Sequence, residues 1–163
     1  MAPLQFCQSR FYGYKYIALL DKDEFLIPNP DKFGFSLKSY LDSEFSEGLA
    51  GIVLLVRLHI TNWGMTNSSS NFVIEQYLNG SVAVPDRVKN IIMPSRVRPG
   101  SLSCHEFDPL KGFHKTIANP NDIVIHHYRR CRSNGYTIGE NKDLFFERSM
   151  GNCMGIKRHY QKH

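Results

Sequence analysis

Three short apolar runs constrain the fold of this chain more than any other feature. They cover residues 14–20 (YKYIALL), 51–60 (GIVLLVRLHI) and 122–128 (DIVIHHY), and they are rich in branched and aromatic side chains. None approaches the roughly 18 apolar residues that a membrane-spanning helix needs. Runs of this length and composition are typical of buried β-strands, so we expect a sheet-based core and no transmembrane segment in this chain.

The segments between these runs carry mixed signals. Apolar side chains recur at helical spacing over residues 36–45, and residues 143–150 have a similar pattern, which predicts two helices. Residues 89–94 (KNIIMP) predict a short strand, whereas residues 72–77 (FVIEQY) fit either a strand or a short helix. The sequence PNP at residues 28–30 predicts a break. This order indicates an α/β fold class, with a mixed sheet and flanking helices.

Composition bounds the chain only loosely. Its 163 residues, with 42% hydrophobic and 21% charged side chains, exclude intrinsic disorder and suit a globular domain. The net charge of +5 suits an anionic ligand, or equally a mildly basic surface. Basic residues are scattered and the aromatic residues indicate core packing, so we expect no nucleic-acid partner. No CxxC pair occurs, which argues against a zinc knuckle; two disulfides or free thiols are both open for the four cysteines, Cys7, Cys104, Cys131 and Cys153.

The sharpest chemical feature is the sequence DKDE at residues 21–24, directly after the first apolar run. Side chains two residues apart point to the same side of a strand, so Asp21 and Asp23 can converge where the strand runs out into a loop. Two carboxylates suit a hard divalent cation such as Mg²⁺ or Mn²⁺, which can neutralise a departing diphosphate. The alternative interpretation is an acidic turn that ends a strand.

A pair of histidines, His126 and His127, lies near the end of the third apolar run. Neighbouring residues on a strand point to opposite faces, so we expect the two side chains to have different roles. One of them could bind the same cation, because Mn²⁺ accepts nitrogen ligands more readily than Mg²⁺ does. The alternative is one packed and one exposed histidine.

The acidic motif and the histidine pair lie in segments that resemble a known protein family. Residues 16–28 resemble the strand and DxDEF-x-x-P motif of the glycosyltransferase family 92 domain, which belongs with the GT-A glycosyltransferases. The further segments that resemble this family follow in the family's order: Trp63-Gly64 with its aromatic-Gly loop, residues 72–77 with V-I-E-x-[YF], residues 89–94 with K-x-I-v-x-P, His105 with an isolated histidine, and residues 126–129 with its H-Y-R strand.

The resemblance implies the C-terminal portion of a GT-A (nucleotide-diphospho-sugar transferase) fold. It implies a transferase that moves a hexose, with galactose expected, from a UDP-sugar donor to a glycan acceptor with inversion. The expected cofactor is Mn²⁺ (or Mg²⁺), and its implied ligands are Asp21, Asp23 and His127.

Other site residues follow from the same resemblance. Glu24 and Arg129 are expected at the donor, and Arg57 or Arg130 are alternatives for its phosphate oxygens. Inversion requires one general base to deprotonate the acceptor hydroxyl. We assign this role to Glu75, and the alternatives that stay open are Glu106 and Asp108.

Three features depart from the family pattern. Lys22 occupies the middle of the DxD motif, where the family usually has an apolar residue, and His126 is additional. Only 20 residues precede Asp21, where a GT-A domain normally has a nucleotide-binding half. We therefore expect residues 14–156 to form a partial family 92 domain without that half. A poorly defined segment (residues 1–13) and a basic tail (residues 157–163) would flank it.

The leading hypothesis is thus a glycosyltransferase. A full-length relative is expected at the Golgi or secretory-pathway membrane, through an N-terminal anchor that this chain lacks. A hypothesis of a different class is a truncated, catalytically inactive glycosyltransferase-like domain that binds glycan or protein. A third, a metal-dependent phosphohydrolase, would need further acidic residues at matched strand ends, and the sequence shows no clear set.

Overall fold

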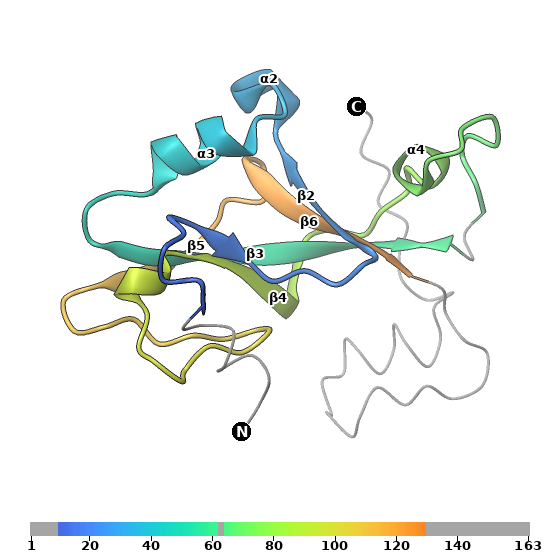
Figure 1. Ribbon diagram of the computed structural model, residues 1–163. Helices are drawn as coiled ribbons and strands as arrows, with labels where there is room; N and C mark the ends of the chain where they lie inside the picture. Colours follow the sequence, from blue (N-terminus) through green and yellow to red (C-terminus); the bar gives the residue numbers. More distant parts are fainter. Residues whose placement is uncertain (1–9, 62–63, 130–163) are drawn as a thin grey trace. The chain divides into compact units, whose positions relative to one another are not determined.

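The computed structural model of the protein describes residues 10–61 and 64–129 (Figure 1). These residues fall into two compact units. The first unit comprises the chain up to residue 56 together with residues 83–126, and the second comprises residues 57–82 and the chain from residue 127. The helix predicted at 143–150 and the basic tail lie outside the described residues, as do Trp63 and Arg130.

The first unit is built on a mixed sheet. The strand order is β1-β4-β3-β6-β2, and β5 pairs with β3 outside this path. β3 runs antiparallel to β4 and parallel to β5, which confirms the mixed α/β class. The last residues of β3 and β6 belong to the second unit. The strands are β1 (Ile17–Ala18), β2 (Glu24–Pro28), β3 (Leu49–Ile60), β4 (Val84–Ile92), β5 (His114–Ile117) and β6 (Ile123–Arg129).

Two of the three apolar runs are confirmed as buried strands, β3 and β6. The prediction of a buried strand over residues 14–20 was wrong in extent. Only Ile17–Ala18 pair, with β4, and Tyr14 is 63% exposed. β1 lies at an edge of the sheet, and β4 extends beyond this pairing to Val84, so β1 ends because the chain leaves β4 to cross to β2 at the opposite edge.

Helices α2 (Pro30–Phe33) and α3 (Leu37–Glu44) follow β2. α3 confirms the prediction for residues 36–45, with the Ser36 hydroxyl accepting the Ser39 N–H at 3.1 Å as its N-cap. α2 was not predicted. Asn29 is its N-cap and Pro30 occupies its first turn. The residues that were expected to interrupt the secondary structure therefore begin a helix instead.

The segment 72–77, which left strand and helix open, forms a short helix, α4 (Val73–Gln76), in the second unit. Among the described residues, no helix is long and apolar enough to cross a bilayer.

The two faces of the sheet in the first unit are covered differently. Figure 1 shows α2 and α3 on one side and the segment 94–113 on the other. On the second side, Ile92 packs with Val97, Leu102 and Phe107 in one apolar cluster. A Cβ added at Gly51 would lie 2.6 Å from the Phe107 ring, so that cluster reaches the sheet backbone itself. This packing holds β4, and hence the site described next, in a fixed position.

Candidate functional site

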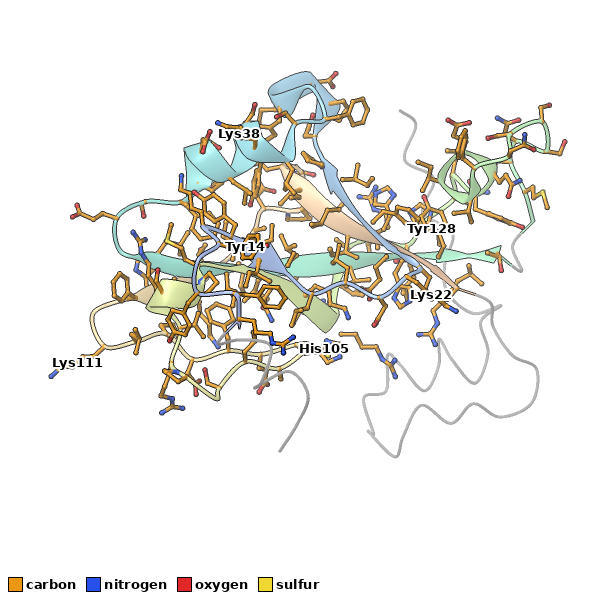
Figure 2. All side chains as sticks on the ribbon, viewed as in Figure 1. Tyr14, Lys22, Lys38, His105, Lys111 and Tyr128 are labelled. Carbon is orange, nitrogen blue, oxygen red and sulfur yellow. The ribbon has the colours of Figure 1, made fainter. Side chains whose placement is uncertain are left out.

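Residues 21–24 form a tight turn between β1 and β2 in the first unit. The Glu24 N–H donates to the Asp21 carbonyl at 3.1 Å, and the Asp21 N–H donates to Glu24 Oε2 at 2.9 Å. Backbone and side chain therefore close the turn from both ends. Lys22 is exposed in this turn (Figure 2), the Asp21 side chain is 65% exposed, and Asp23 is half-buried.

A buried lysine on the sheet reaches this turn. Lys89 lies on β4 opposite Leu54 of β3. Its Nζ donates to Asp21 Oδ2 at 3.0 Å and lies 3.1 Å from Glu24 Oε2. The side chains of Lys89 and Glu24 are only 2% and 0% exposed. Because the chain crosses from β1 to β2 over the sheet, two carboxylates 68 and 65 positions away in the sequence meet a cation that rises from the sheet.

In this cluster one cation is shared by two carboxylates. Burial alone would lower the pKa of Lys89, but its hydrogen bonds and ion pairs with Asp21 and Glu24 outweigh burial and raise that pKa above its ordinary value. Lys89 is therefore an ammonium ion at neutral pH. The Lys89 ammonium group thus supplies a positive charge to the acidic turn from within the protein.

Asp21 and Asp23 have the chemistry that a hard divalent cation requires. Such cations are often held by one or two carboxylates together with substrate phosphates, rather than by a cage of protein ligands. Within the described part of the chain, no group of three or more His, Cys, Asp or Glu side chains is arranged to hold a metal ion. The Glu24 side chain is buried against Lys89, so its carboxylate stabilises the turn and is not exposed to solvent.

The other candidates of the first unit lie after η2 (Pro94–Arg96). His105 is exposed, and its Nδ1 lies 2.8 Å from the Val88 carbonyl, next to Lys89 in the sequence. Asp108 forms an ion pair with Arg98, and Glu106 is exposed. The isolated histidine therefore contacts the residue directly before the stretch 89–94.

The second unit holds the remaining candidates. The Tyr128 ring stacks on the His59 ring at 4.6 Å between centroids, and its hydroxyl donates to the Ile74 carbonyl at 3.4 Å. The strand β6 therefore contacts the helix α4 within this unit. Because side chains alternate along β6, the buried His127 and the half-buried Arg129 point away from the face that Tyr128 shares with His59.

Glu75, assigned as the general base, is exposed on α4. Its Oε2 accepts a hydrogen bond from the Ser70 hydroxyl at 2.5 Å. The carboxylate is accessible to a proton donor from solvent. It belongs to the second unit, together with His127 and Arg129, whereas Asp21, Asp23 and Glu24 belong to the first.

Sequence reasoning assigned no role to Lys89 or His59. His59 is 2% exposed, and its Nδ1 lies 2.8 Å from the Tyr77 carbonyl. His59 interrupts the apolar run 51–60, and Lys89 begins the stretch 89–94. A polar side chain that is buried in such a stretch needs a hydrogen-bond or ion-pair partner. That interruption was the available signal, although it does not identify the partner.

Comparison with protein-family models gives no match, and comparison with curated proteins gives none either.

Proposed function

We propose that this chain is the DxD-bearing part of a glycosyltransferase that moves a hexose, galactose, from a UDP-sugar to a glycan acceptor with inversion. The observation that carries the proposal is the acidic turn held by Lys89. Residues 21–24 and Lys89 belong to two separate segments that resemble family 92, and they form one ion-paired cluster. A full-length relative would act at the Golgi or secretory-pathway membrane.

The residues take the following roles in this proposal. Asp21 and Asp23 would hold Mn²⁺ (or Mg²⁺), and when bound the cation would supply positive charge to the departing diphosphate. Glu24 and Lys89 keep the turn in shape. Arg129 donates to donor phosphate oxygens. The exposed Glu75 carboxylate takes the proton of the acceptor hydroxyl.

The test is the release of UDP from UDP-galactose in the presence of Mn²⁺. Asp23→Ala is the informative variant, because Asp21 also pairs with Lys89 and its loss would disturb the turn. We expect release to fall at least about tenfold, the lower range for disturbing a metal site. Glu47→Ala removes an exposed acid outside the turn and serves as the matched control. Equal release from wild type and Asp23→Ala would contradict the metal role.

One observation favours a second function, a catalytically inactive glycosyltransferase-like domain that binds glycan or protein. Lys89 already compensates charge on Asp21 and Glu24, so the turn is stable as an ion-paired structure in its own right. Calorimetric titration with Mn²⁺ separates the two functions. An active transferase should bind Mn²⁺ and release UDP, whereas the inactive domain should do neither while remaining folded.

A further inference from the structure

Arg57 occupies an unusual position in the second unit. It lies on β3 two residues before His59, so both side chains project from the same face of the strand. The buried Gly80 packs on both of them. A Cβ at Gly80 would lie 2.9 Å from Cγ and Cδ of Arg57 and from Cε1 of His59. Backbone therefore covers the aliphatic part of Arg57 and restricts where its guanidinium can point.

The guanidinium of Arg57 has no partner among the described residues. Its Nε is buried without a hydrogen bond, and the side chain forms no ion pair with any residue that the structure describes. Burial lowers the pKa of Arg57, although the group remains charged at neutral pH because its ordinary pKa is so high. A partly desolvated cation without a partner costs free energy, which a bound anion would offset.

The described residues of this unit carry more basic than acidic side chains. Among residues 57–61, 64–82 and 127–129, the only acid is Glu75, which is exposed and bonded to Ser70. Against it stand two arginines, Arg57 and Arg129. The described part of the second unit therefore supplies Arg57 with no counter-charge in contact.

We propose that Arg57 anchors a binding site for a phosphate-type oxyanion. The planar guanidinium matches the geometry of phosphate oxygens, and because Nε is buried the contact runs through the two terminal nitrogens. Phosphate is favoured over a carboxylate because it brings more charge and more acceptor oxygens to a cationic region. The natural source of the anion, but not the site, rests on the proposed function, which would make it the diphosphate of the nucleotide sugar.

Calorimetric titration with pyrophosphate, at fixed ionic strength and without metal, tests the site directly. Wild type should bind saturably, and Arg57→Met should bind at least about tenfold more weakly, because hydrogen bonds to charged groups are strong. Methionine preserves an unbranched stem against Gly80. Lys111→Met makes the same change of charge on an exposed loop (Figure 2) and should bind as wild type does. Absence of saturable binding by wild type, or an equal loss in both variants, overturns the proposal.

A second variant keeps arginine in place. Gly80→Ala would force the Arg57 stem aside, and we expect severalfold weaker binding from a protein that retains its full charge. This variant also serves if Arg57→Met does not fold, as judged by circular dichroism. Wild-type affinity in folded Gly80→Ala and Arg57→Met proteins overturns the proposal.

Further ligands identify the source of the anion and separate this proposal from the function above. Tighter binding of UDP than of pyrophosphate would identify a nucleotide, and equal binding would identify free phosphate species; acetate binding as tightly as phosphate would overturn the phosphate-type site. Pyrophosphate binding without UDP release leaves the site standing while the transferase fails. If the protein releases UDP but Arg57→Met binds pyrophosphate as wild type does, the transferase proposal stands and the Arg57 site fails.

Discussion

The two units of the molecule treat a cation from a strand in opposite ways. In the first unit, Lys89 is buried and its ammonium group lies between the carboxylates of Asp21 and Glu24. In the second unit, Arg57 is half-buried and contacts Gly80. Glycine has no side chain, so it cannot provide a negative charge for the guanidinium. A buried charge must be compensated, and here the compensation is internal in the first unit, whereas the described residues of the second unit offer Arg57 none.

The difference separates a structural ion from a candidate binding ion. Removing Lys89 would leave Glu24 buried and charged, so the fold itself depends on that lysine. Removing Arg57 takes away a group that nothing in the described chain needs as a partner. The same substitution, a cation replaced by methionine, therefore has opposite expected consequences in the two units.

The largest expected effect is that of Lys89→Met on stability. Breaking a buried ion pair typically costs about 3–5 kcal/mol, because the remaining charge stays buried without a partner. Urea denaturation should show a loss of unfolding free energy in this range. Adding Glu24→Gln to Lys89→Met should recover part of the loss, since it removes the isolated carboxylate. A loss below about 1 kcal/mol would contradict an internally compensated pair.

Alkaline pH should break the same cluster without a mutation. The pKa of Lys89 is raised in the folded protein above its ordinary value of 10.5. Its contribution to stability is therefore complete below that value and is lost as pH rises through the folded-state pKa. Burial also raises the pKa of Tyr128, to about 12, which contributes in the same direction.

The difference between wild type and Lys89→Met isolates the lysine from the tyrosines. Between neutral pH and about pH 10, urea denaturation of both proteins should show a constant difference in unfolding free energy, which then shrinks as pH rises further. A difference that stays constant throughout the alkaline range would show that Lys89 is not coupled to the carboxylates.

The extent to which the sequence predicts this structure follows the same division between local and distant partners. β3 and β6 were predicted from local runs of apolar residues, and α3 was predicted from apolar side chains at helical spacing. β5 was missed because all four of its residues are exposed, and its pairing with β3 depends on residues more than sixty positions away. The extent of β1 was wrong for a similar reason, since the point at which the chain leaves β4 to cross the sheet toward β2 depends on the tertiary fold.

The candidate site shows the same limit. The acidic turn was identified from four adjacent residues, but its ion pair with Lys89 was not, because nothing local links positions 68 residues apart. Whether Asp21 and Asp23 bind a metal stays a prediction. The chemistry of two carboxylates can be identified from the sequence, whereas the partner that already compensates one of them appears only in the fold.

The smallest expected effect is that of Arg57→Met on stability, and it is the sharpest check on the comparison. The variant keeps most of the apolar contact with Gly80 and removes a partly desolvated charge, so its unfolding free energy should lie within about 1 kcal/mol of wild type. Phosphate should stabilise wild type against urea but not this variant, because only a ligand of the folded state raises stability. A loss as large as that of Lys89→Met would mean that Arg57, too, is compensated within the chain, and the contrast between the two units would disappear.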